Sequence, residues 1–301
     1  MPFANFPKIC QIYKDRLFVR DLVSTGIDYL SYRTEFWRQS KPLYARKMVS
    51  ATIPPSSDPI NDALTKMVDM EMITNEDPTN YSKIVKIVDY EINRIGKCTE
   101  KQLQQSAVKS GNHVVTKTEL ICELALHAGR ACMRHFQEFE SDDSFNKASE
   151  YFKMVYNMTK STLSKMSLGS QPDVALERLG RLYVIKNNLE LAIKAWLKRE
   201  QFLSNHKDEL VILYHDIGRG YLTLRNHIAA MEYANLSQSM VSDQILKMNV
   251  MVLQAEIYLD SKEIDKAKSV LESCLNIARD EKDTGAEKAV LDLLDRLRVR
   301  V

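Results

Sequence analysis

The feature that most constrains how this chain can fold is a group of residues that recurs at a nearly constant interval. Gly180 and Gly218 are 38 residues apart, and Tyr221 and Tyr258 are 37 residues apart. Such self-similarity predicts a stack of repeated units rather than a globule. The three copies consist of Leu179, Gly180, Tyr183, Ala192 and Trp196; of Ile217, Gly218, Tyr221, Ala230 and Ala234; and of Ala255, Tyr258, Ala267 and Leu271.

The order of these residues is typical of tetratricopeptide repeats, which are helix pairs of about 34 residues. A glycine on the first helix lets an alanine on the second helix approach its backbone, and the tyrosine fills the seam. Ala234 departs from the pattern, because a bulky residue normally stands at its position. One pair cannot bury its apolar face alone, so the pairs must stack. The expected fold is all-α: a tetratricopeptide-repeat superhelical solenoid with an extended N-terminal arm.

Composition supports a helical chain. Glycine and proline together are 17 of the 301 residues, whereas average usage is roughly 12%. Seven of the eight prolines lie at or before Pro78, so irregular backbone is expected mainly in the first quarter. Polar turns separate the helices of each pair, and asparagine is favoured in them because it tolerates left-handed backbone. These turns are Lys186 to Asn188, Arg225 to Asn226 and Asp260 to Lys262.

We expect three regions along the chain. Residues 1–57 form the N-terminal arm and a linker, residues 58–116 form short helices and a second linker, and residues 117–301 form the solenoid with a C-terminal capping helix. In the second region, helices are predicted over 59–73 and 81–95 because breaker-rich segments bound them. The capping helix, from Gly285, places Leu291, Leu294 and Leu297 on one stripe.

A weaker upstream copy spans residues 119–166, with Gly129 in its first helix and Ala148 and Phe152 in its second. The interval from Gly129 to Ala148 is 19 residues, whereas Gly180 to Ala192 is 12. This difference predicts an insertion in the turn around FESDDS. The segment SQPD, from Ser170, is interpreted as the cap of the first helix in the next copy.

Charge and cysteine content exclude several classes of protein. With 42 basic and 40 acidic residues, no global charge recruits nucleic acid or an anionic membrane. The five cysteines are widely spaced and include no C-x-x-C pair, which predicts reduced thiols rather than a disulfide framework. The N-terminus lacks an unbroken apolar stretch, and no run of eighteen apolar residues occurs, so neither secretion nor membrane insertion is expected.

Metal binding and catalysis are not expected, and neither is any cofactor. Cys122, His127, Cys132 and His135 point in different directions around one helix and cannot converge on one ion. The glycines at 218 and 220 follow a helical pattern rather than a strand, so they do not form a phosphate-binding loop. No signature of a nucleophile elbow, metalloprotease, kinase or phosphate-binding loop is present.

Two sets of residues are candidates for partner binding. The groove set lies on the first helices of the repeats, in pairs four residues apart that align vertically on the predicted concave surface; an alternative is that they are simply solvated charges. It consists of Glu177, Arg181, His215, Arg219 and Glu256, with Val252 beside Glu256.

The second set lies in a basic, aromatic stretch of the arm, residues 32–47, with an excess of four positive charges. Tryptophan and arginine are common anchors at interfaces, so this stretch is expected to dock on a partner or to fold back onto the repeats. No nucleic-acid-binding fold accompanies it. The anchors are Phe36, Trp37, Arg38, Lys41, Tyr44 and Arg46.

The stretch DRLFVRDLVSTGIDYLSYRTEFWRQSKPLYARK resembles a junction in the tetratricopeptide-repeat subunit family of the outer dynein arm docking complex, where TGI-x-YL and FWRQ-x-KP-x-YAR occur. The segments LERLGRLYVIKNNLELAIKAW and LYHDIGRGYLTL resemble that family's repeats in sequence and order. The resemblance extends from about Asp15 to Leu297. The family also has an earlier repeat block and a long charged tail, which these 301 residues do not include.

The resemblance implies a non-catalytic scaffold in the axoneme of cilia or flagella, with a cytoplasmic pool. Its implied partners are coiled-coil docking subunits, outer-arm dynein and the doublet microtubule. Two alternatives remain open from the residues alone. One is a cytosolic tetratricopeptide adaptor for the peptide tails of chaperones or signalling proteins, and the other is a nucleic-acid binder that uses the basic arm.

Overall fold

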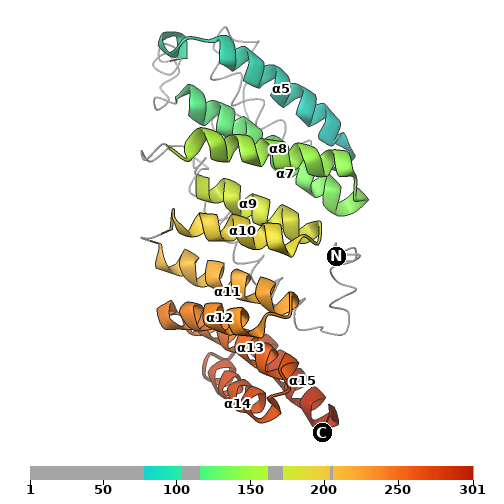
Figure 1. Ribbon diagram of the computed structural model, residues 1–301, viewed down its shortest axis with the longest axis vertical. Helices are drawn as coiled ribbons and strands as arrows, with labels where there is room; N and C mark the ends of the chain where they lie inside the picture. Colours follow the sequence, from blue (N-terminus) through green and yellow to red (C-terminus); the bar gives the residue numbers. More distant parts are fainter. Residues whose placement is uncertain (1–77, 104–115, 162–171, 204–205, 301) are drawn as a thin grey trace. The chain divides into compact units, whose positions relative to one another are not determined.

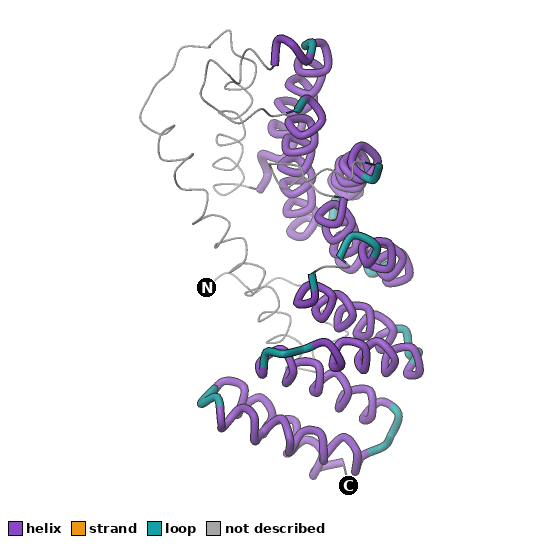
Figure 2. The backbone as a smooth tube through the Cα atoms, turned by 90° about the vertical axis from the view of Figure 1, so that its left-hand side faces the viewer, coloured by secondary structure: helices purple, strands orange, loops and turns teal. Residues whose placement is uncertain are grey.

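A computed structural model of the chain describes residues 78–103, 116–161, 172–203 and 206–300. Within these ranges every regular element is a helix, and short turns join consecutive helices (Figure 2). The described helices fall into two compact units, of which the first ends at Lys186 and the second begins at Asn187. The expected all-α, tetratricopeptide-type fold is confirmed. The N-terminal arm, the helix expected over 59–73 and the cap at Ser170 lie outside the described residues.

The first unit contains a 3-10 helix, η1 (Pro78–Asn80), followed by α5 (Tyr81–Lys97), α7 (Lys117–Phe139), α8 (Asp142–Thr159) and α9 (Pro172–Ile185). The helix expected over 81–95 is thus confirmed and ends two residues later. α7 packs against both α5 and α8, and α8 packs against α9 (Figure 1). This order makes each helix a neighbour of the next along the chain.

The helix pair α7 and α8 is the predicted upstream copy. Thr116 begins α7 with a capping box, in which its hydroxyl accepts from the amide of Glu119 and the Glu119 carboxylate accepts from the amide of Thr116. Gly129 lies directly against the ring of Phe152, since a Cβ atom at residue 129 would be 2.5 Å from Phe152 Cε1. Phe152 and Ala148 are both fully buried. The small residue therefore lets the two helices approach closely.

The predicted insertion in the turn of this copy is wrong. α7 ends at Phe139 and α8 begins at Asp142, so only two residues form the turn. The extra residues lengthen the helices instead. Gly129 is ten residues before the end of α7, whereas Gly218 is five residues before the end of its helix. FESDDS is mostly helical because Asp142 and Asp143 are favoured in the first turn of a helix.

The second unit contains six helices, which pack against one another in chain order (Figure 1). Leu271 and Cys274 of the fifth helix are fully buried between Val252 of the fourth and Leu294 of the last. The helices are α10 (Leu189–Glu200), α11 (Lys207–Thr223), α12 (His227–Met240), α13 (Gln244–Asp260), α14 (Ile264–Asp280) and α15 (Thr284–Arg300).

Gly218 shows why the repeat pattern requires a small residue. A Cβ atom on Gly218 would lie 3.2 Å from the carbonyl oxygen of Ala230 and 3.2 Å from Leu253 Cδ2. Ala230 and Ala234 of α12 are fully buried in this contact. Leu253, from the next helix pair, is fully buried against them. The bulky residue that Ala234 replaces is therefore supplied by α13.

The helix-pair turns use left-handed backbone as expected, although asparagine supplies it only once. Asn187, Arg225 and Lys262 have φ angles of 61°, 59° and 64°. After Arg225, the amide of Asn226 donates to the carbonyl of Tyr221, which closes the helix with a Schellman motif. The Asn226 side chain then accepts from the amide of Ala229 and begins α12. Asparagine therefore acts in this turn as the cap of the second helix.

The capping helix is present as α15, with one correction to its apolar stripe. Leu294 and Leu297 are buried, but Leu291 is 37% exposed. Val290 takes the buried position one residue earlier, and Leu293 joins it, so the stripe follows 290, 293, 294 and 297. Among the described helices, none combines the length and the apolar character that a membrane span requires.

Candidate functional site

In the first unit, the groove candidates Glu177 and Arg181 form an ion pair on α9. Arg181 Nε lies 2.7 Å from Glu177 Oε1, and Arg178 Nε lies 3.7 Å from Glu177 Oε2. The vertical alignment expected for residues four apart is confirmed. Arg181 is partly exposed, whereas Glu177 is largely buried. The carboxylate therefore orients an arginine that remains accessible on this helix.

In the second unit, Arg219 and Glu256 connect two helix pairs. Arg219 Nη1 on α11 lies 3.1 Å from Glu256 Oε2 on α13, and these side chains are only 13% and 7% exposed. An ion pair with so little exposure is strengthened by its surroundings but loses hydration, so its main effect is on specificity of packing. The pair therefore fixes the position of α11 against α13.

His215 lies one turn before Arg219 on the same face of α11. Its Nδ1 is 3.4 Å from Asp216 Oδ1. Its Nε2 is buried, as is Nη2 of Arg219, and the described residues offer neither atom a hydrogen-bond partner. Two neighbouring polar nitrogens are thus available to a segment that brings an acceptor. Val252, which the sequence placed beside Glu256 in the groove, belongs instead to the apolar core.

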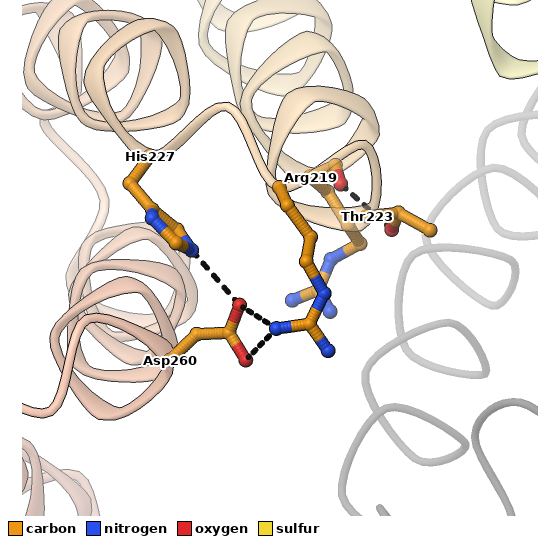
Figure 3. A network of polar contacts seen from close by, with 5 residues as sticks. Arg219, Thr223, His227 and Asp260 are labelled. Carbon is orange, nitrogen blue, oxygen red and sulfur yellow. Dashed lines mark hydrogen bonds and ion pairs between the residues drawn. The ribbon is translucent and has the colours of Figure 1, made fainter.

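A second polar cluster of this unit was not anticipated. Asp260, the last residue of α13, accepts from His227 Nε2 at 2.8 Å and contacts Arg225 Nη1 at 3.2 Å (Figure 3). His227 begins α12, and Arg225 is the left-handed residue of the preceding turn. One carboxylate therefore holds the turn of the neighbouring helix pair. Only the left-handed angle of Arg225, invisible in the sequence, accounts for this meeting.

The cysteines and histidines of α7 behave as packing residues. Burial raises the pKa of the Cys122 and Cys132 thiols to about 12. His135 stacks between Tyr81 and Phe139, with ring centroids 3.9 Å and 4.7 Å away, and burial lowers its pKa. The described residues contain no group of three potential metal ligands.

The arm anchors, Phe36, Trp37, Arg38, Lys41, Tyr44 and Arg46, lie outside the described residues. Their role is therefore still a prediction from the sequence. The glycines at 218 and 220 lie inside α11, where Gly220 packs against Ile193 of α10. A helical setting of this kind fits packing rather than phosphate binding.

A comparison with protein families matches residues 249–281 to the tetratricopeptide repeat. The matched range covers most of α13 and all of α14. It contains Ala255, Tyr258, Ala267 and Leu271, which are the third copy of the sequence pattern. The repeat identified from residue spacing is therefore confirmed in this copy.

The curated proteins similar to this chain include outer dynein arm-docking complex subunit 4 from several animals. The Xenopus laevis protein is 28% identical over 92% of this chain, and the Bos taurus and Homo sapiens proteins are 26% and 25% identical over 94%. The resemblance expected from the sequence is confirmed. The chain spans 50%, 39% and 40% of the length of these three relatives.

Two solved structures are also similar. The crystal structure of BtubC (BKLC) from P. vanneervenii has a TM-score of 0.43 and 12% identity, and it covers 71% of this chain and 91% of that protein. The crystal structure of the APC/C hetero-tetramer Cut9-Hcn1 has a TM-score of 0.40 and 16% identity, with 77% of this chain and 46% of that chain covered.

Proposed function

We propose that this tetratricopeptide-repeat chain, similar to outer dynein arm-docking complex subunit 4, is a non-catalytic scaffold that helps to anchor outer dynein arms to axonemal doublet microtubules. The observation that carries the proposal is the extent of the similarity, which covers 92% to 94% of the chain with relatives that share one name. A match of that extent includes the arm as well as the repeats.

The partners proposed for this scaffold are coiled-coil docking subunits, outer-arm dynein and the doublet microtubule. Its proposed location is the axoneme, with a cytoplasmic pool before assembly. Stacked helix pairs support the role because they present long surfaces built from neighbouring repeats. No membrane and no nucleic acid is needed for it, and the near balance of 42 basic and 40 acidic residues agrees with a protein partner.

We assign partner contacts to the groove residues in two local sets. In the first unit, Glu177 orients Arg181 toward the partner. In the second unit, His215 and Arg219 each keep a polar nitrogen for an acceptor, and Glu256 holds Arg219 in place. The six arm anchors between Phe36 and Arg46 would add a separate docking segment.

The second candidate function is a cytosolic adaptor for peptide tails. The polar nitrogens of His215 and Arg219 favour it, because a short peptide supplies backbone carbonyls or a carboxylate at that spacing. Such an adaptor would bind an isolated short peptide saturably and would not remain with axonemes.

Fractionation of cilia or sperm flagella tests the scaffold directly. The chain is followed beside outer-arm dynein through detergent extraction and then through high-salt extraction. The proposal expects the chain to resist detergent and to be released together with docking subunits. Absence from the axoneme, with all of the chain in the soluble fraction, would refute the scaffold and favour the adaptor.

A charge-swapped variant separates partner binding from packing at the second set. Arg219→Glu with Glu256→Arg keeps an ion pair between α11 and α13 but reverses the charge that each helix offers. The proposal expects a similar melting temperature and a loss of docking-subunit binding. If the swap binds normally while Arg219→Ala alone does not, the pair acts only through packing.

A further inference from the structure

The face of α5 that points away from the core carries a line of lysines. The buried face of this helix consists of Ile84, Val88, Glu91 and Ile95. Opposite to it, exposed residues recur three and four positions apart, which places them along one straight stripe. We call this the α5 stripe: Lys83, Lys86, Tyr90, Asn93 and Lys97. Tyr90, near its centre, is 63% exposed.

The acidic residues of α5 do not neutralise this stripe. Glu91 is fully buried and pairs with Arg94, whose Nη2 lies 2.7 Å from its Oε2. Asp89 lies off the stripe, where its Oδ1 accepts from Tyr151 of α8 at 2.7 Å. Lys83, Lys86 and Lys97 form no ion pair within the described part of the chain. The stripe therefore carries three uncompensated positive charges.

The C-terminal end of α5 adds to this field rather than reducing it. Lys117, from the start of α7, donates to the carbonyl oxygens of Gly96 and Cys98. It neutralises the partial negative charge that the end of a helix carries. An acidic segment that approaches Lys97 therefore meets no opposing charge from the helix end.

From these observations we propose that the α5 stripe binds an acidic helical segment of a protein partner. The stripe runs from residue 83 to residue 97, a length of about 21 Å along the helix. A partner helix with glutamates or aspartates three and four residues apart would place a carboxylate beside each lysine, while Tyr90 supplies apolar contact area. A straight row of charges matches a helix better than an irregular loop.

This surface deepens the proposed scaffold function by adding a partner chemistry, and it rests on that function only for the setting in which the partner occurs. Its test uses the purified full chain. Failure of the test would leave the axonemal location intact, and absence from the axoneme would leave the binding measurement intact.

The probe is a fluorescent alanine-based helical peptide with six glutamates on one stripe, measured by anisotropy in about 0.1 M salt. A second peptide has the same composition with the glutamates spread around the helix. The proposal expects the striped peptide to bind several-fold more tightly. Equal binding of the two peptides would overturn the helical match, and so would equal or tighter binding of a single-stranded RNA of the same charge.

The variant replaces Lys83, Lys86 and Lys97 by glutamine. Each exposed ion pair contributes a factor of about 1.5 to 5 to binding, so the triple variant is expected to lose about tenfold in affinity. The matched control replaces three exposed lysines on other helices, Lys153, Lys194 and Lys198, by glutamine and gives the same change in net charge. It is expected to bind within twofold of the parent. Equal losses in the two variants would overturn the proposal.

Discussion

Replacing Gly129 by alanine is the sharpest test of how the first helix pair is held together. The added Cβ atom would lie 2.5 Å, 2.9 Å and 3.0 Å from three atoms of the Phe152 ring. Carbon atoms in favourable contact are about 3.5 to 4.0 Å apart, so the ring and helix must separate by roughly 1 Å. Phe152 is fully buried, which leaves the ring no open space to enter.

The size of the effect follows from two opposing terms. Overpacking a core costs about 1 to 3 kcal/mol, and three close contacts favour the upper end of that range. Alanine has better helix propensity than glycine, which returns about 1 kcal/mol. We therefore expect Gly129→Ala to lower the free energy of unfolding by about 2 kcal/mol, or the melting temperature by about 4 to 8 °C.

Circular dichroism at 222 nm during thermal and urea unfolding measures this change. Gly96→Ala on α5 is the matched control, because no atom lies within 4 Å of the added Cβ, and its expected effect is a stabilisation of up to about 1 kcal/mol. In the Gly129→Ala background, Phe152→Leu makes room and should cost less than in the parent. If Gly129→Ala stabilises the chain as Gly96→Ala does, the proposed close contact is wrong.

Two further predictions concern the second unit. Burial raises the pKa of the Cys274 thiol to about 12, so the folded state keeps a proton that the unfolded state releases above pH 9. This stabilisation is complete below pH 9 and is lost as pH rises toward 12. In urea unfolding between pH 9 and pH 10.5, Cys274→Ala should reduce the loss of stability by about 1.4 kcal/mol per pH unit, and equal slopes would contradict this. Asp260→Ala removes the acceptor of His227 and Arg225 and should cost about 1 to 2 kcal/mol in thermal unfolding. Asp280→Ala, at the exposed end of α14, should stay within about 0.5 kcal/mol, and similar losses in both would show that Asp260 has no special role.

The periodic part of the fold was predictable because its residue types have a single packing explanation. Gly218, Ala230 and Tyr221 recur at fixed intervals, and that spacing alone indicates a helix pair. The ring of Tyr221 indeed stacks on Tyr233 of the second helix, with centroids 5.6 Å apart. What the spacing could not give was the position of the inserted residues, since a longer turn and longer helices yield the same interval.

The candidate site was predictable only as far as one helix reaches. Residues four apart on α9 were expected to align, and the ion pair between Glu177 and Arg181 follows from helix geometry. The contact between Arg219 and Glu256 joins different helices, so its 3.1 Å distance depends on how α11 packs against α13. Val252 was misplaced for the same reason, because the width of the buried stripe on α13 is set by α14 and α15.

The long helix pair of the first unit shows where a repeat of this kind tolerates added length. α7 and α8 are both extended at the end where they meet, beyond the contact between Gly129 and Phe152. Seven extra residues turn a helix through about 700°, which is only 20° short of two full turns. An insertion of this size at a hairpin tip therefore leaves the register of the packed faces unchanged. Repeats of different length in homologous chains should consequently be aligned on the glycine and alanine contact, with gaps assigned to the tips of the hairpins.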